Sequence, residues 1–340
     1  MRLVYGTLLL LFSTLQSGPD SSFIFDTAPF ASCHASTIVE LRNGDLLAAW
    51  FGGSGEGHPD VAIWNSRLSQ GRWSTPTVLA REPDIATYNP VFFYTNDGKL
   101  WLYYKFGPHP DRWAAARRSS LDNGETWSAT EHLPAGLYGP IRAKPLVLND
   151  GTVVSGTSVE AYGTWACWIE RSTDNGQTFR RIGPIAVPGP SVPVLSGKPY
   201  GIIQPSVVSL GGARLRFYAR STAQIGKICI ADSIDNGLTW TPARPIEVPN
   251  PNSGIDAVSL RDGRIVLVYN NTVTGRSPLN LAVSHDGEHF RMFYTLENEP
   301  GAEFSYPAMI QGQNGDLLIT YTWKRRKIRY VRFPLAAIPQ

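Results

Sequence analysis

The chain has 340 residues, more than an average single domain, and a net charge of only +3 at pH 7. This charge is too small to indicate a nucleic acid or any other highly charged partner. The 32 glycines, 26 prolines and 11% aromatic residues instead suit a fold with many turns and large side chains packed between its units.

Residues 1–17 have the pattern of a secretory signal peptide. Arg2 supplies a positive charge, residues 8–12 form a short apolar core, and small polar residues follow. That core is too short to span a membrane. We therefore expect a secreted or periplasmic protein that is not bound to a membrane once the signal is removed.

The cysteine and histidine patterns indicate no metal site. Cys33, Cys167 and Cys229 form no close pair, and the last two lie in apolar runs typical of buried thiols. One disulfide stays possible, because spacing alone does not exclude it. The six histidines are scattered, and no zinc-type spacing is present, so we expect no metal and no cofactor.

Six turn dipeptides recur along the chain, each between two apolar, strand-like runs. Asn and Gly adopt positive φ at little cost, so these dipeptides favour hairpins. Their spacings are 54, 53, 61, 51 and 52 residues, and a period of this size is typical of an array of similar units. The six turns are Asn43-Gly44, Asp97-Gly98, Asp150-Gly151, Gly211-Gly212, Asp262-Gly263 and Asn314-Gly315.

A second motif, S-x-D-x-G-x-x-W/F, follows the same period. It occupies residues 120–127, 172–179 and 233–240, and a copy one residue shorter occupies 284–290. We interpret its aspartate as a turn cap without a chemical role. The aromatic residue that ends the motif starts the next strand and can pack between units.

These repeats predict an all-β fold, a six-bladed β-propeller of four-stranded antiparallel blades formed by residues 23–335. The last blade has strands at 306–311, 317–323 and 328–333, and the N-terminal segment 23–25 is expected to supply its fourth strand. That pairing closes the ring and removes exposed sheet edges. The basic stretch 324–332 is interpreted as a solvated hairpin, and no nucleic acid is expected to bind.

The inner strands of such a ring converge on its axis, where we expect a polar pocket. Aligning the repeats places one polar residue from each unit at the start of its inner strand. The alternative is a water-lined channel mouth without chemistry. The six aligned residues are His34, Asn89, Lys144, Gln204, Asp256 and Tyr306.

Second strands and one loop add further candidates at the same mouth. Lys105, Arg220 and Asn270 lie where second strands end. The glycine-rich loop 52–60 can bring Glu56 or Asp60 close to a ligand, because glycine allows a close backbone approach.

On these motifs the whole mature chain resembles the sialidase (neuraminidase) superfamily, in its BNR-repeat or predicted-neuraminidase branch. The S-x-D-x-G-x-x-W/F motif is the Asp box of that family. The resemblance implies an arginine triad on a sugar carboxylate, a tyrosine nucleophile assisted by a glutamate, and an aspartate acid. Tyr306 matches the nucleophile, Arg220 the second triad arginine, and Arg276 the third.

The chain departs from the family pattern at three places. His34 stands where the first triad arginine is expected, and Gln204 lies in the segment that carries the assisting glutamate. The aspartate acid has no clear match, although Glu56 and Asp60 lie in the corresponding loop. These differences leave sialidase activity itself open, because a fold does not supply a function.

The residues suit an exo-acting glycosidase that removes an acidic sugar from an oligosaccharide or polysaccharide. A phenol has a pKa of about 10, so a tyrosine nucleophile needs activation, and Arg220 and Lys144 are the candidate cations. Both would also bind a carboxylate, with Arg276, Gln204, Asn89, Lys105 and Asn270 completing the predicted binding set. Asp256 or Glu303 would act as the base and Glu56 as the acid; a direct pairing of Glu56 with Asp256 is also conceivable.

Two other functions use the same residues. A polysaccharide lyase would neutralise a uronate with Arg220 and Lys144, and would abstract the α-proton with Tyr306 or His34. A non-catalytic glycan-binding propeller would stack sugar rings on tryptophans. The tryptophans considered are Trp50, Trp64, Trp113 and Trp165.

Overall fold

The structure is a computed structural model that describes residues 18–161, 164–189 and 199–340. The predicted signal peptide, residues 1–17, lies outside the described residues. No helix in the described part of the chain is long and apolar enough to cross a membrane. The described cysteines Cys33, Cys167 and Cys229 are all buried and free, so they form no disulfide with one another.

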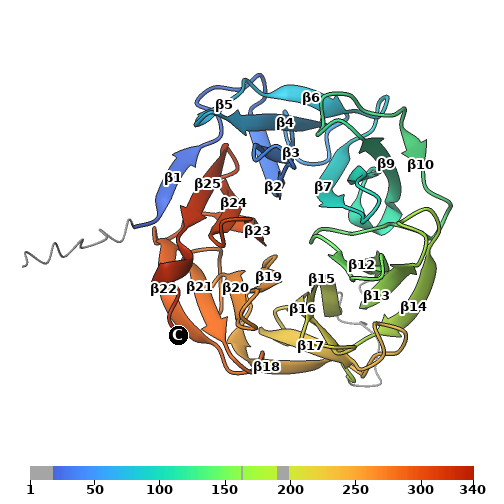
Figure 1. The fold of residues 1–340 in the computed structure, drawn as a ribbon, viewed down its shortest axis with the longest axis vertical. Coiled ribbons are helices and arrows are strands. Elements are labelled where there is room, and N and C mark those ends of the chain that lie inside the picture. Colours follow the sequence, from blue (N-terminus) through green and yellow to red (C-terminus); the bar gives the residue numbers. More distant parts are fainter. Residues whose placement is uncertain (1–17, 162–163, 190–198) are drawn as a thin grey trace, which may run out of the picture.

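Antiparallel sheets are arranged around a common centre, and the chain passes from one to the next (Figure 1). The first sheet contains β2 (Ser32–Glu40), β3 (Leu46–Gly53), β4 (Ala62–Ser69), β5 (Arg72–Trp73) and β6 (Thr77–Ala80). The second contains β7 (Thr87–Tyr94), β8 (Leu100–Phe106), β9 (Ala114–Ser120) and β10 (Glu131–His132), with the short 3-10 helix η1 (Pro110–Arg112) between β8 and β9.

The next two strand groups join into one eight-stranded sheet through a parallel contact between β13 and β15. Its first half contains β11 (Leu146–Val147), β12 (Val153–Ala161), β13 (Thr164–Ser172) and β14 (Arg180–Ile185). Its second half contains β15 (Tyr200–Ser209), β16 (Leu215–Ser221), β17 (Lys227–Ser233) and β18 (Arg244–Pro249).

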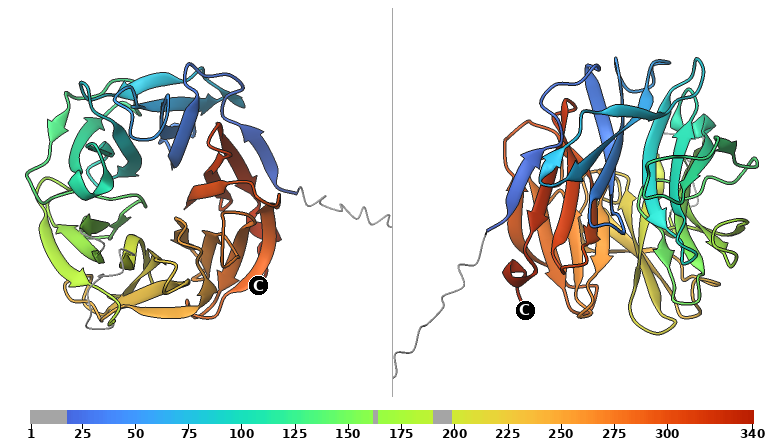
Figure 2. Two further views of the ribbon diagram at one scale, coloured as in Figure 1. Left: turned by 180° about the vertical axis from the view of Figure 1, so that it is seen from behind. Right: turned by 45° about the horizontal axis from the view of Figure 1, so that its top comes forward.

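Two four-stranded sheets complete the arrangement. One contains β19 (Asp256–Ser259), β20 (Ile265–Tyr269), β21 (Leu279–Ser284) and β22 (Arg291–Glu297). The other contains β23 (Phe304–Gln311), β24 (Leu317–Trp323), β25 (Lys327–Phe333) and the N-terminal β1 (Asp20–Phe23), and the short helix η2 (Leu335–Ala337) follows it. The further views in Figure 2 show the sheets standing side by side around the centre.

The N-terminal segment pairs with the last sheet, as predicted. β1 runs antiparallel to β25, with Phe23 opposite Arg329, and Ile24 donates a backbone hydrogen bond of 3.0 Å to Ile328. The strand itself is Asp20–Phe23, a few residues earlier than expected. This pairing covers the edge of β25 with the first described strand.

Aromatic and aliphatic side chains fill the spaces between neighbouring sheets. Phe51 of the first sheet lies 5.6 Å from Tyr88 of the second, measured between ring centroids. Phe25 stacks on Trp50 at 5.1 Å, in a buried cluster that also contains Tyr330 of the last sheet. Burial of this apolar area stabilises the arrangement and fixes the inner strands relative to one another.

The Asp boxes are turn caps, as their sequence predicted. In the box at 233–240, Ser233 Oγ donates to Asp235 at 2.8 Å and accepts the Gly237 N–H at 2.9 Å. Thr239 donates both its N–H and its hydroxyl to the same carboxylate. The hydrogen bonds from Thr239 lower the pKa of Asp235 to about 2. The box at 120–127 repeats this pattern.

We expect Asp235→Ala to lower the melting temperature at pH 7 by about 2 °C, because the turn loses its acceptor. The pKa of Asp235 is depressed in the folded state, so its contribution is complete above the unfolded carboxyl pKa of about 3.9 and is lost as the pH falls toward 2. Thermal melts of both proteins between pH 7 and pH 2 measure this. A difference in melting temperature that did not shrink with acidification would contradict it.

Four inner strands contain a left-handed residue near their start. Ala35, Asn89, Gln204 and Tyr306 have φ values of 55°, 41°, 57° and 51°, and the strand pairing shifts at each. Each of these strands ends in a hairpin that is closed by a backbone N–H, and the left-handed residue lies six positions before the residue that donates it. In the first sheet, for example, the donor is Leu41 and the left-handed residue is Ala35. In the other two units the N–H groups of Leu148 and Leu260 close the hairpins. The equivalent positions, six residues earlier, are therefore Arg142 and Gly254.

The predicted alignment of the six polar residues is therefore wrong at three of them. His34 lies one residue before the equivalent position, which is Ala35, and Lys144 and Asp256 lie two residues after theirs. Successive strand residues point to opposite faces of a sheet. An error of one residue therefore places a side chain on the wrong face, and an error of two residues places it on the right face but farther along the strand. Only the offset at His34 lies beside a bulge; the inner strands β11 and β19 of the other two units have no register shift, and there the alignment chose a polar residue two positions too late.

Candidate active site

The hydroxyl of Tyr306 is the centre of a polar cluster at the inner ends of the sheets. It accepts a hydrogen bond from Arg220 Nη1 at 2.7 Å and another from Gln204 Nε2 at 3.1 Å. Gln204 Oε1 lies 3.4 Å from the same Arg220 nitrogen, and Asn252 accepts from Arg220 Nε at 2.7 Å. Both neighbours of the phenol oxygen are donors, an arrangement that stabilises negative charge developing on it.

Three guanidinium groups surround the ring of Tyr306. The central guanidinium carbons of Arg142, Arg276 and Arg220 lie 5.4, 5.5 and 5.8 Å from the ring centroid. A cation at this distance from an aromatic face is attracted to it, and more strongly where water is excluded. The site is therefore strongly electropositive around one tyrosine.

Arg142 is a site residue that sequence reasoning missed. It is 3% exposed, donates through Nη2 to the carbonyl of Pro307, and has no partner for Nε or Nη1 among the described residues. Burial lowers its pKa. Counting back six residues from Leu148 finds it, whereas the alignment on polar residues before proline led to Lys144 instead.

His34 packs against Tyr306 as a neutral ring. Their centroids are 4.1 Å apart, and His34 Nδ1 lies 3.0 Å from the hydroxyl of Thr322. Burial, and then the nearby charge of Arg325, lower the pKa of His34 well below its usual value. Its Nε2 has no partner within the described part of the chain. His34 is thus uncharged and does not replace the positive charge of a triad arginine.

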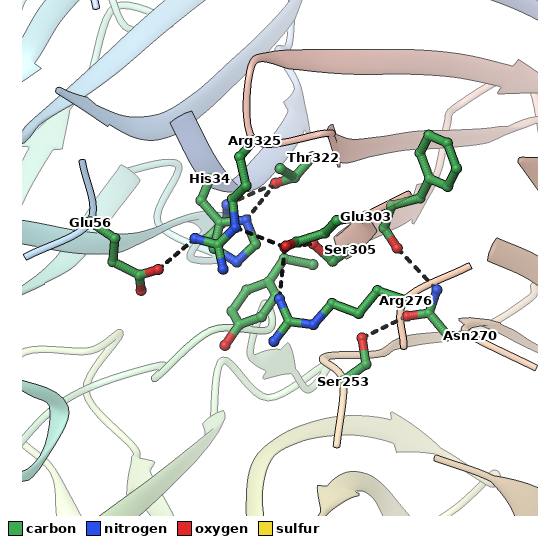
Figure 3. Close-up of polar contacts among 12 residues, drawn as sticks. His34, Glu56, Ser253, Asn270, Arg276, Glu303, Ser305, Thr322 and Arg325 are labelled. Carbon is green, nitrogen blue, oxygen red and sulfur yellow. Dashed lines mark hydrogen bonds and ion pairs between the residues drawn. The ribbon is translucent and has the colours of Figure 1, made fainter. Parts of the chain in front are cut away.

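Glu303 connects two arginines beside this histidine (Figure 3). Its Oε1 accepts from Arg276 Nη1 and Arg325 Nε, both at 2.8 Å, and from Ser305 Oγ at 2.7 Å. Burial would raise the pKa of Glu303, but the two arginines and Ser305 outweigh it and hold that pKa below its usual value. Arg325 also binds Glu56 through Nη1 at 2.5 Å. Arg325 belongs to the stretch interpreted from sequence as a solvated hairpin.

Glu160 is a second residue that the sequence did not reveal. It lies near the end of β12, opposite Trp165 of β13, and the Trp165 ring is 5.5 Å from the guanidinium carbon of Arg220. Burial raises the pKa of Glu160, and the opposing charge of Arg220 does not cancel this effect. A carboxyl group in this environment keeps its proton to higher pH than usual.

Comparison with known proteins decides the family. A model of the BNR repeat-like domain matches residues 44–319. The chain belongs to the BNR repeat-like family. Its sialidase-like character, predicted from the Asp boxes, is confirmed. None of the curated proteins matches it significantly.

Solved structures similar to this BNR repeat-like protein include sialidases. NanB sialidase from Streptococcus pneumoniae is 14% identical with a TM-score of 0.75, covering 94% of this chain and 71% of its own. The intramolecular trans-sialidase of Ruminococcus gnavus is 13% identical with a TM-score of 0.73, covering 94% and 98%. A Dyadobacter fermentans protein of unknown function is 15% identical with a TM-score of 0.76, covering 93% and 100%. Identities this low show the fold alone.

Lys144 and Asp256 of this BNR repeat-like protein bind each other instead of Tyr306. Asp256 is 1% exposed, and its carboxylate accepts from Ser206 Oγ at 2.6 Å, Met309 N–H at 2.8 Å and Lys144 Nζ at 3.0 Å. The pair connects the segment before β11 to the first residue of β19. A catalytic role for Asp256 stays a prediction, while the geometry indicates a structural one.

Three other predicted site residues donate hydrogen bonds to backbone carbonyl groups, namely Lys105, Asn89 and Asn270. Lys105 is fully buried and donates to the Pro140 carbonyl at 2.8 Å, and burial lowers its pKa to about 7. Asn89 donates to Ile141 at 3.2 Å, and Asn270 donates to Phe304 at 3.0 Å. The structure does not bring these three side chains to Tyr306, so we leave them out of the proposed site.

The tryptophans considered for sugar stacking differ in accessibility. Trp50 is fully buried. Trp64 donates to the Gly52 carbonyl, and Trp113 packs against Tyr88 at 5.0 Å. Trp165 alone among these four lies beside Arg220. No group of three or more His, Cys, Asp or Glu among the described residues is placed to hold a metal ion.

Proposed function

We propose that this protein is a secreted, exo-acting glycoside hydrolase that removes an acidic sugar from a glycan. The observation that carries the proposal is the Tyr306 hydroxyl, which accepts hydrogen bonds from Arg220 and Gln204 while three guanidinium groups surround its ring. Arginines bind a carboxylate in a two-pronged geometry, so they select an anionic sugar and also stabilise charge on the tyrosine.

We also propose that residues 23–335 form one closed propeller of six blades. Six hairpins support this count, because each is closed six residues after the equivalent position of its inner strand. In this count the eight-stranded sheet contains two blades. The pairing of β1 with β25 supports closure. Export rests on the sequence of residues 1–17.

In the proposed reaction Tyr306 attacks the anomeric carbon as the bond to the leaving oxygen breaks. The family's assisting glutamate is absent at Gln204, so the proton of Tyr306 needs another acceptor. His34 is neutral and packs on Tyr306, and in the tautomer whose Nδ1–H donates to Thr322 its unpartnered Nε2 can accept that proton. Water then releases the sugar from the tyrosine.

Glu160 is the proposed general acid. A glycosidase acid must be protonated near neutral pH, and burial favours the protonated form of Glu160. Glu56, which the sequence suggested, is half exposed and already bound to Arg325. Its role as the acid remains the alternative.

For Glu160→Gln we expect about a hundredfold loss of kcat on a substrate with a poor leaving group, and a smaller loss on a 4-methylumbelliferyl glycoside. In the parent protein the acid is protonated below its raised pKa, so activity falls as the pH rises through that value. The variant should lack this alkaline fall, and Glu56→Gln should retain it. If the activity of Glu160→Gln still decreased as the pH rises, another group would have to be the general acid.

An elimination reaction is the second candidate, favoured by neutral His34, which lies next to Tyr306 and whose Nε2 has no hydrogen-bond partner among the described residues. A base at this place and a carboxylate neutralised by arginines are what β-elimination of a uronate needs. A panel of sialosides and uronate-containing glycans separates the functions. Sugar release without new ultraviolet absorbance establishes hydrolysis, and an absorbing unsaturated product establishes elimination. Binding without either signal would indicate a glycan-binding propeller.

A further inference from the structure

The hairpin between β24 and β25 has two non-glycine residues in the left-handed conformation. Lys324 and Arg325 have φ values of 53° and 58°, and the Arg326 N–H closes the turn on the Trp323 carbonyl at 3.0 Å. Asn and Gly usually occupy both central positions of such a turn, because other side chains are strained there. Strain of this kind persists where the side chain is needed.

Arg325 directs its guanidinium group into the candidate site (Figure 3). Its carbonyl accepts the Cys33 N–H at 2.9 Å, which fixes the turn beside His34. Its Nε binds Glu303 and its Nη1 binds Glu56. Because Glu303 also binds Arg276, one carboxylate places two guanidinium groups side by side.

The cluster carries more positive than negative charge. Four arginines lie around Tyr306 and His34, namely Arg142, Arg220, Arg276 and Arg325, whereas the carboxylates bound to them are Glu303 and Glu56. A partly buried excess of positive charge favours an anionic ligand. His34 adds no charge, and Arg325 is the arginine whose charge lowers the pKa of His34 most.

Glu56 is a removable partner of Arg325. Its side chain is 44% exposed, and it lies in the glycine-rich loop 52–60. Glu303, in contrast, is bound by two arginines and Ser305. The Glu56 carboxylate therefore occupies a position on Arg325 that a ligand carboxylate can take.

We propose that Arg325 binds the carboxylate of the acidic sugar, and that Glu56 occupies this position until the sugar displaces it. This inference rests on the proposed function, because it assumes an acidic sugar at the Tyr306 site. In this inference the positive charge that His34 lacks is provided by Arg325, in the hairpin between β24 and β25.

The test compares Arg325→Gly with Lys324→Gly, since both changes relieve the same kind of backbone strain. Lys324 binds Glu299, outside the cluster, and so serves as the matched control. The probes are 4-methylumbelliferyl glycosides of N-acetylneuraminic and glucuronic acid, and calorimetric binding of 2,3-didehydro-2-deoxy-N-acetylneuraminic acid. Both variants should melt at or above the parent temperature. Arg325→Gly alone should raise KM and Kd by about ten- to hundredfold.

A third variant, Glu56→Gln, should change affinity in the opposite direction. Removing the competing carboxylate should lower Kd several-fold, because the sugar no longer displaces a charged partner. If Arg325→Gly does not fold, Glu56→Gln by itself tests the inference. An unchanged Kd of Glu56→Gln would then overturn it.

The outcomes separate the two proposals. Equal KM and Kd in Arg325→Gly and Lys324→Gly, with an active parent protein, overturn the role of Arg325 and leave the hydrolase. Binding that depends on Arg325 without turnover overturns the hydrolase and supports Arg325. A parent protein that neither binds nor cleaves these probes overturns both.

Discussion

Tyr306→Phe should reduce kcat by about a thousandfold or more while leaving the fold intact. The change removes only the hydroxyl, so the ring keeps its packing against His34 and its contacts with three guanidinium groups. Turnover needs the oxygen as nucleophile or base, whereas ground-state binding relies mainly on the arginines. Steady-state kinetics and calorimetry measure the two effects separately.

Tyr321→Phe is the matched control for Tyr306→Phe. Tyr321 lies on the neighbouring strand β24 and donates its hydroxyl to Glu297 at 2.8 Å, away from the cluster. We expect this control to lower stability slightly and to leave kcat unchanged. Full activity in Tyr306→Phe would remove the proposed site, and lost binding in the same variant would show that the hydroxyl acts mainly in affinity.

Asp256→Ala should lower the free energy of unfolding by about 3 kcal/mol, because removing one partner of a buried ion pair leaves the other uncompensated. Asp256 also accepts hydrogen bonds from Ser206 of β15 and Met309 of β23, so these two groups and Lys144 lose an acceptor. Denaturant-induced unfolding of the parent and the variant measures the loss.

The double variant Asp256→Asn with Lys144→Met tests whether the pair is the cause. We expect its destabilisation to be smaller than the sum of the single changes, because neither charge is then left without a partner. A loss of turnover in Asp256→Ala with less than about 1 kcal/mol of destabilisation would instead support the catalytic role predicted from sequence.

Short-range patterns were sufficient to predict the repeating part of the fold. The bonds of each Asp box join residues at most four positions apart, as from Ser233 to Gly237, and the hairpin dipeptides act over two residues. These interactions depend on local backbone geometry, so composition and spacing predict them. The pairing of the N-terminal segment with the last sheet followed from counting strands.

The site was predicted in part, for reasons that particular residues make clear. Tyr306 and Arg220 meet as the family resemblance implied, and Gln204 touches both. Arg142 was missed because the alignment on polar residues before proline selected Lys144, which precedes Pro145. Glu160 was missed because nothing in its local sequence distinguishes it from other strand residues.

The sequence by itself determined the repeat, its turns and the tyrosine at the start of the last inner strand. The tertiary structure decided which charges meet there: Arg325 reaches the site from a hairpin that reads as solvated, while Asp256 and Lys144 neutralise each other. Turns arise from neighbouring residues, whereas a site at the centre of several sheets depends on bulges, side-chain length and burial, which act between residues far apart in the chain.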